Sequence, residues 1–249
     1  MTEEFAIPSE ALYEMLKKKN VGYLYHANTV ATSLTFFNVG ALISRHEAEI
    51  DGLPQSFQKS DAHDKKHEVW DFVYLDGTDH HRIYSRSNFY GPVLFRISLE
   101  LLNSPLFPHV FITRSNPINW NDNMTLDDKF YKTIGEVDAD YLTKRKLDSQ
   151  IMFIFKSPGK SINLKEFLDS VGIDEPSFQV KLKSGEEIDL AVYIRHVISK
   201  GMTDNGLENI PLLKRSHKFF QGCICWGQYK MICQFDKNEF RRRFDRTAV

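Results

Sequence analysis

The amino-acid sequence predicts an α+β fold. Stretches typical of strands and stretches typical of helices are mixed, without the strict strand–helix–strand alternation of a parallel α/β protein. Aromatic residues make up 13% of the chain and include 19 phenylalanines, which indicates a core rich in β-structure and bulky side chains. With 249 residues, the chain is long enough to bury such a core.

Short apolar runs mark the expected strands, because buried strands read as runs of β-branched, aliphatic and aromatic residues. We expect strands at 21–26, 69–76, the start of 90–102, 109–115 and 150–156. Two later segments, 178–190 and 219–235, are expected to form hairpins, the second turning around Gly227.

Helices are predicted at 8–20, 29–39, 164–172 and 189–201. In the first of these, Ser9 is placed to cap the N-terminus, and lysines in the last turn match the helix dipole. Gly40 follows the second as a C-terminal stop. The segment 46–68 is polar and reads as a long loop with some helix, and long loops within a domain are often functional.

Composition limits the classes of function. The net charge is −1, so nucleic acid would have to bind through a local patch. No apolar run reaches the about 18 residues of a membrane span, and the acidic N-terminus is unlike a signal peptide. The three cysteines, an odd number, argue against a disulfide framework and are expected to be buried apolar residues. We therefore expect a cytoplasmic protein without a membrane partner.

Two stretches combine an apolar element with polar residues at its end. The first, YLYHANTVATSLTFFNVGALISR (23–45), is a strand ending in His26 and Asn28, an apolar helix, a glycine, and then Ser44 and Arg45. The second, VFITRSNPINW (110–120), is a strand followed by an Arg-Ser turn. A weaker third stretch, KRKLDSQIMFIF (144–155), has a basic lead-in before Gln150 and an apolar strand.

In this order, the three stretches resemble the DarT-like ADP-ribosyltransferase toxins, which modify nucleic acid with NAD. The resemblance covers roughly residues 21–172. It implies an ADP-ribosyltransferase-like split antiparallel sheet with flanking helices around an NAD cleft. We expect one domain over 1–249, in which 173–249 form a C-terminal extension with a helix and a hairpin.

The resemblance also implies roles for individual residues. Histidine or asparagine at a strand tip can hydrogen-bond a ribose hydroxyl or the nicotinamide amide, arginine can pair with pyrophosphate, and tyrosine can stack on nicotinamide. The implied NAD-binding residues are His26, Asn28, Thr29, Ser44, Arg45, Tyr84 and Tyr90. The implied catalytic residues are Gln150 and Arg45.

Gln150 departs from the family pattern, which places a catalytic glutamate there. A glutamine can hydrogen-bond a hydroxyl, but it has no charge and cannot act as a base. Three explanations stay open: an inactivating change, a different alignment of this segment, or a carboxylate supplied from elsewhere. The candidates for that carboxylate are Asp148, Glu136 and Glu208.

The implied partners are a DNA or RNA substrate and a neutralising antitoxin, as expected of a toxin in antiphage defence. Basic stretches with aromatics near the C-terminus offer a candidate phosphate-binding patch. The alternative is a nucleic-acid-binding or nuclease-like defence protein without NAD chemistry. The acidic and histidine residues of 61–81 would then be its active centre.

Overall fold

The central feature of the computed structural model is one sheet that joins the N-terminal and C-terminal parts of the chain. The structure describes residues 3–58, 60–83, 90–141, 143, 150–156, 161–182, 184–215 and 224–244. Within these ranges the sheet has eight strands. Their order is β1 (Ile7–Pro8), β6 (His109–Ile112), β7 (Met152–Lys156), β4 (Phe72–Asp76), β2 (Tyr23–Asn28), β5 (Val93–Ser98), β9 (Leu168–Ile173) and β12 (Leu212–Lys214).

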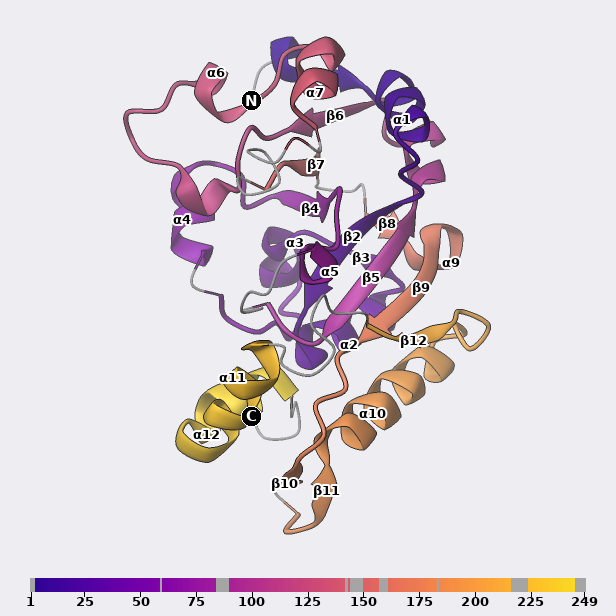
Figure 1. Ribbon diagram of the computed structural model, residues 1–249, viewed down its shortest axis with the longest axis vertical. Coiled ribbons are helices and arrows are strands. Elements are labelled where there is room, and N and C mark those ends of the chain that lie inside the picture. The colour runs from indigo at the N-terminus through magenta and orange to yellow at the C-terminus, as the bar shows by residue number, and fades with distance from the viewer. Residues whose placement is uncertain are drawn as a thin grey trace.

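The sheet is split in its middle. Neighbouring strands are antiparallel except β9 and β12, which are parallel. Strand β2 pairs with β5 along its whole length, but it meets β4 at the single pair Tyr25 and Asp76. Figure 1 shows β4, β6 and β7 on one side of this junction, while β2, β5 and β9 run together on the other. The prediction of an α+β fold with a split, mostly antiparallel sheet is confirmed.

Helices flank the sheet (Figure 1). The α-helices described are α1 (Ser9–Lys18), α2 (Val30–Val39), α3 (Arg45–Ile50), α4 (Asp61–Lys66), α5 (His80–Ile83), α6 (Leu126–Lys129), α7 (Ile134–Asp140), α9 (Leu164–Phe167), α10 (Leu190–Asp204), α11 (Ile224–Phe235) and α12 (Lys237–Phe244). Short 3-10 turns are η1 (Glu3–Phe5), η2 (Leu99–Asn103) and η3 (Pro117–Asn119). Helix α2 contacts both α10 and α12, which links the C-terminal segments to the β2–α2 unit.

Local signals define the β2–α2 unit. Thr29 caps α2, because its hydroxyl accepts a hydrogen bond from the Thr32 amide at 3.2 Å. Gly40 ends the helix in the left-handed conformation, with φ of 75°, which glycine adopts without steric cost. The predicted helix and its glycine stop are therefore confirmed. At α1, by contrast, Ser9 is the first helical residue and its hydroxyl makes no capping hydrogen bond.

The main apolar core runs through both parts of the sheet and reaches from Ile7 to Phe244. Fully buried aromatic rings fill its centre, including Phe37, Phe95 and Phe153. A second, smaller cluster surrounds Trp120 and Phe130 on the side of β4, β6 and β7. The core therefore holds the two parts of the sheet together although their strands meet at one residue pair.

Three expectations are wrong. The described part of the segment 219–235 is not a hairpin but the helix α11, where Cys225, Tyr229 and Ile232 are buried at helical spacing. The expected helix at 164–172 is helical only in α9 and continues as β9. Cys225 is buried as expected, but it is disulfide-bonded rather than a free thiol, whereas Cys233 is free and only partly buried.

The predicted hairpin at 178–190 is confirmed as β10 (Gln179–Lys181) paired with β11 (Glu187–Asp189). A second small sheet pairs β3 (Ala41–Leu42) with β8 (Ile162–Asn163). Within the described ranges, no helix combines the length and the hydropathy that crossing a bilayer requires.

Candidate functional site

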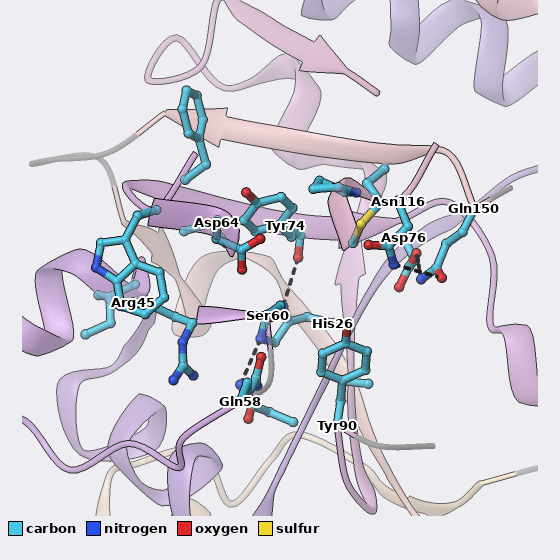
Figure 2. A pocket seen from close by; sticks show the side chains of 18 of the residues that line it. His26, Arg45, Gln58, Ser60, Asp64, Tyr74, Asp76, Tyr90, Asn116 and Gln150 are labelled. Carbon is cyan, nitrogen blue, oxygen red and sulfur yellow. Dashed lines mark hydrogen bonds between the residues drawn. The ribbon is translucent and has the colours of Figure 1, made fainter. Parts of the chain in front are cut away.

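A pocket lies at the split between β2 and β4 (Figure 2). Residues from β2, β4 and the start of β7 line it, together with polar residues of the segment between α3 and α4. Its lining comprises His26, Ala27, Asn28, Phe36, Ile43, Arg45, Gln58, Ser60, Asp64, Trp70, Phe72, Val73, Tyr74, Asp76, Tyr90, Asn116, Pro117, Gln150 and Met152. The structure thus brings together five residues that the sequence analysis singled out, namely His26, Asn28, Arg45, Tyr90 and Gln150.

The pleat of the sheet explains which side chains reach the pocket. Alternate residues of a strand point to the same face, so Phe72, Tyr74 and Asp76 of β4 share the face toward the pocket, and Val73 between them also contributes to the lining. Asp76 is paired in register with Met152 of β7, which also lines it. The pocket wall is therefore continuous across these two strands.

His26 is held as a neutral ring in a single tautomer. Its Nδ1 lies 2.8 Å from the Tyr74 carbonyl oxygen, which can only accept, so Nδ1 carries the proton. Its Nε2 therefore accepts from Asn28 Nδ2 at 3.2 Å. Burial lowers the pKa of His26 despite the Tyr74 hydrogen bond. The Asn28 amide has a second N–H that a ligand in the pocket can use.

Two other residues implied as NAD-binding do not line the pocket. Thr29 and Ser44 are buried N-caps of α2 and α3, and neither lines the pocket. Their hydroxyls accept from Thr32 and Glu47 amides and so fix the helices that position Phe36 and Arg45. Tyr84 lies outside the described residues.

Arg45 is the cation of the pocket. Its Nη2 donates to the Asp61 carboxylate and to the Ser56 carbonyl, both at 2.9 Å. Its Nε and Nη1 are buried and have no hydrogen-bond partner within the described part of the chain. Leaving a buried donor unsatisfied costs about 1–3 kcal/mol. The guanidinium therefore offers two donors to an anionic acceptor in the pocket.

Asp64 lies near Arg45, and the pKa of its carboxyl is raised. Burial raises the pKa of its carboxyl to about 6, although a hydrogen bond with Ser60 and the charge of Arg45 oppose the shift. Near neutral pH this carboxylate is partly protonated. Asp61 and Asp64 are both close enough to interact with the charge of the Arg45 guanidinium.

Gln150 is held firmly just before β7. Its Nε2 donates to Asp76 Oδ1 at 2.8 Å, and its Oε1 accepts from Asn116 Nδ2 at 3.1 Å. Its backbone has φ of 60°, a left-handed conformation that is unfavourable for a residue with a side chain. Such strain is maintained only where surrounding contacts enforce it, and it often marks functional sites.

The alternative carboxylates named from the sequence do not fill the place of a glutamate at position 150. Glu136 binds Arg114 at 2.8 Å and caps α7, away from the pocket lining. Glu208 is exposed and also absent from that lining. Asp148 lies outside the described residues. The acidic residues of the described lining are instead Asp64 and Asp76. The sequence signal for Asp76 is its alternation with Phe72 and Tyr74.

The acidic and histidine residues of 61–81 are dispersed among separate partners rather than gathered in one centre. Asp61 binds Arg45, and the buried Asp79 binds Arg215 at 2.8 Å. His80 Nε2 lies 3.6 Å from Asp76. Among the described residues, no group of three or more histidine, cysteine and acidic side chains is placed to hold a metal ion.

The basic C-terminal stretches are similarly engaged within the protein. Arg215 and Arg243 are buried, and Arg242 and Arg243 both bind Glu239. These three arginines are therefore not arranged as an exposed phosphate-binding patch.

Comparison with solved structures finds matches of low identity over most of the chain. The chain is similar to DarT. The structure of Thermus sp. 2.9 DarT in complex with ADP-ribosylated ssDNA is 12% identical, with a TM-score of 0.49, over 79% of this chain and 95% of that chain. The NAD+ complex of the same protein is 10% identical, with a TM-score of 0.47, over 78% and 96%. The carba-NAD+ complex is 9% identical, with a TM-score of 0.45, over 78% and 96%.

No protein-family model matches the sequence, and no curated protein matches it.

Proposed function

We propose that this protein is an NAD-dependent ADP-ribosyltransferase that acts on nucleic acid. The observation that carries the proposal is the pocket at the split of the sheet, which joins His26, Asn28, Arg45, Tyr90 and Gln150. These residues come from segments more than a hundred positions apart in the chain. Within this pocket Arg45 has two buried donors without partners in the described part of the chain.

The chemistry of the lining suits a dinucleotide. The free donors of Arg45 match the oxygens of a pyrophosphate, which guanidinium binds in a bidentate manner. Aromatic rings of Phe36, Trp70 and Tyr90 offer surfaces on which nicotinamide can stack. The Asn28 amide offers a donor to a ribose hydroxyl or to the carboxamide oxygen.

We further propose a nucleic acid as the acceptor, a role as a toxin in antiphage defence, and an antitoxin partner that blocks the pocket or reverses the modification. One of the DarT structures contains ADP-ribosylated ssDNA, and single-stranded DNA is the first acceptor to test here. RNA of the same sequence distinguishes the two classes of nucleic acid.

Binding and transfer can be tested separately. NAD added to the purified protein should raise its melting temperature, since a ligand at 100 times its Kd stabilises the native state by about 2.7 kcal/mol. Arg45→Gln should remove most of this shift, while Lys18→Gln, at an exposed position of α1, should retain it. Transfer is measured with radiolabelled NAD and single-stranded DNA or RNA. A melting temperature that NAD leaves unchanged would overturn the proposal.

Gln150 favours a second candidate, a protein that binds NAD without turning it over. The family resemblance implies a glutamate at this position, whereas the Gln150 amide in the pocket lining carries no charge. In that case NAD would raise the melting temperature, but no nicotinamide would be released with either nucleic acid.

A further inference from the structure

We propose that Asp76 supplies the carboxylate of this active site, and that Gln150 holds it in place. The proposal rests on the proposed function, since it assigns a catalytic role within that reaction. Asp76 ends β4 beside the start of β7, and it is the β4 residue that pairs with β2 at the junction. Its side chain faces the pocket together with that of Tyr74 (Figure 2).

A chain of hydrogen bonds fixes which way the Gln150 amide points. The Ile118 backbone N–H donates to the side chain of Asn116 at 3.1 Å, so the Asn116 atom at this contact is its oxygen. The Asn116 NH₂ group therefore faces Gln150, whose atom at that contact must be the amide oxygen. This leaves the Gln150 NH₂ group directed at Asp76 Oδ1, 2.8 Å away.

This arrangement depends on the amide. A glutamate at position 150 would place a second carboxylate against Asp76 and would remove the donor between them, and like charges so close cannot both be ionised readily. Glutamine instead donates to a carboxylate on the neighbouring strand. His80 also approaches Asp76, with 3.6 Å between its Nε2 and Oδ1. The negatively charged side chain thus lies at the end of β4, whereas the family resemblance implies a glutamate at the start of β7.

Asp64, the other carboxylate of the described lining, is less suitable. It lies near Arg45, hydrogen-bonded with Ser60, and Figure 2 shows it across Tyr74 from Asp76. Asp64 thus lies on the Arg45 side of the pocket, where the pyrophosphate is proposed to bind. Asp76, by contrast, lies next to Gln150, the position at which the family resemblance implies a catalytic glutamate.

In the proposed step, the bond between the ribose C1′ and the nicotinamide nitrogen breaks, and its electron pair neutralises the positive nicotinamide ring. Positive charge then develops at C1′ and the ring oxygen, where the Asp76 carboxylate stabilises it and accepts a hydrogen bond from a ribose hydroxyl. A lone pair of the acceptor base forms the new bond to C1′, and its proton passes to water.

The decisive variant is Asp76→Asn, which can retain the hydrogen bond because the side-chain oxygen of the introduced asparagine can still accept from Gln150. Nicotinamide release should fall roughly 100- to 1,000-fold in kcat, with KM for NAD changed by less than about threefold, because one charged contact is lost. The melting temperature with and without NAD shows that the variant folds and binds. Asp51→Asn, at an exposed position after α3 and outside the pocket lining, is the control and should retain turnover.

A double variant, Asp76→Asn with Gln150→Glu, tests the charge further. It reverses the hydrogen bond, so that the introduced asparagine donates to the introduced glutamate, and it returns the carboxylate to the start of β7. Turnover should recover at least about tenfold over Asp76→Asn if the carboxylate charge is what the reaction requires. Absence of any recovery in a double variant that folds and binds NAD would count against the assignment.

Failure of this assignment differs from failure of the proposed function. If NAD leaves the wild-type melting temperature unchanged, the proposed function fails and the assignment falls with it. If the wild type binds NAD but releases no nicotinamide, the transferase function and the role of Asp76 are both overturned, and only the assignment of the pocket as an NAD site stands. If the wild type turns NAD over and Asp76→Asn is equally active, only the role of Asp76 is overturned.

Discussion

The imidazole of His26 is hydrogen-bonded across the split of the sheet to the backbone of Tyr74. The two atoms, His26 Nδ1 and the Tyr74 carbonyl oxygen, lie 2.8 Å apart. The contact joins β2 to β4 close to the single pair, Tyr25 and Asp76, at which these strands meet. One side chain thus connects the two parts of the sheet and lines the pocket between them.

Replacing His26 by alanine should therefore affect both stability and binding. The Tyr74 carbonyl would lose its partner in a buried position, at a cost of about 1–3 kcal/mol in the free energy of unfolding. The Asn28 amide would also lose its acceptor. Urea denaturation and NAD titration measure the two effects. His109→Ala, at an exposed position of β6, should change neither, and an unaltered His26→Ala would contradict the assigned contacts.

Arg45→Lys tests the guanidinium. Lysine keeps the charge but loses the planar fork that can bind Asp61, Ser56 and an anion together. We expect NAD affinity to fall roughly 10- to 100-fold, as for the loss of one or two hydrogen bonds to a charged group. Isothermal titration at constant ionic strength measures this fall. Equal affinities for the variant and the wild type would show that Arg45 does not contact the ligand.

Stability should depend on pH through Asp64. Its pKa is raised to about 6 in the folded protein from 3.8, so the native state binds more protons than the unfolded state between these values. Stability is then lost as pH rises from about 4 to about 6, by on the order of 2–3 kcal/mol, and stays lower above pH 6.

Asp64→Asn should remove this contribution and stabilise the protein at pH 7.5 relative to the wild type. Urea midpoints at pH 4.5 and pH 7.5 measure the change. Asp51→Asn, at an exposed position after α3, is the control and should leave the pH dependence as it is. A wild-type and an Asp64→Asn protein with the same pH dependence would contradict the assigned burial.

Gly91→Ala should disturb the pocket through the backbone. Gly91 has φ of +124°, and an added Cβ would lie 2.7 Å from both the Asn28 carbonyl oxygen and the Thr29 Cα. We expect a loss of about 1–3 kcal/mol in stability from the backbone strain alone, with weaker NAD binding because Asn28 is displaced. Gly22→Ala has no atom within 4 Å of the added Cβ and is the matched control. Calorimetric melting with and without NAD compares the two variants.

Local sequence signals were sufficient for the first part of the site. The helix α2 and its glycine stop were predicted, whereas Thr29 and Ser44, which the resemblance implied as NAD-binding residues, are instead the caps of α2 and α3. Two residues apart on one strand, His26 and Asn28 necessarily share a face. These signals act over a few residues, which is why the sequence could predict this part of the structure.

The rest of the site and of the fold depends on contacts between segments that are distant in the sequence. Gln150 and Asp76 are 74 positions apart and meet only because β4 pairs with β7. The segment that forms α11 is rich in isoleucine, tryptophan, tyrosine and phenylalanine, which favour strands, and tertiary packing of its buried face determined the helix. In the sequence, the spacing of Cys225, Tyr229 and Ile232, which form the buried face, was the signal that indicated a helix.

The narrow junction between β2 and β4 has a mechanical consequence. Because one backbone pair and one imidazole hydrogen bond link these strands, widening the gap between them would break few polar contacts. On either side of the junction, β2 is paired continuously with β5 and β4 with β7. Each of these strand pairs would therefore move as one unit. The junction at which the sheet can open most easily is thus also the place at which a bulky ligand would have to enter.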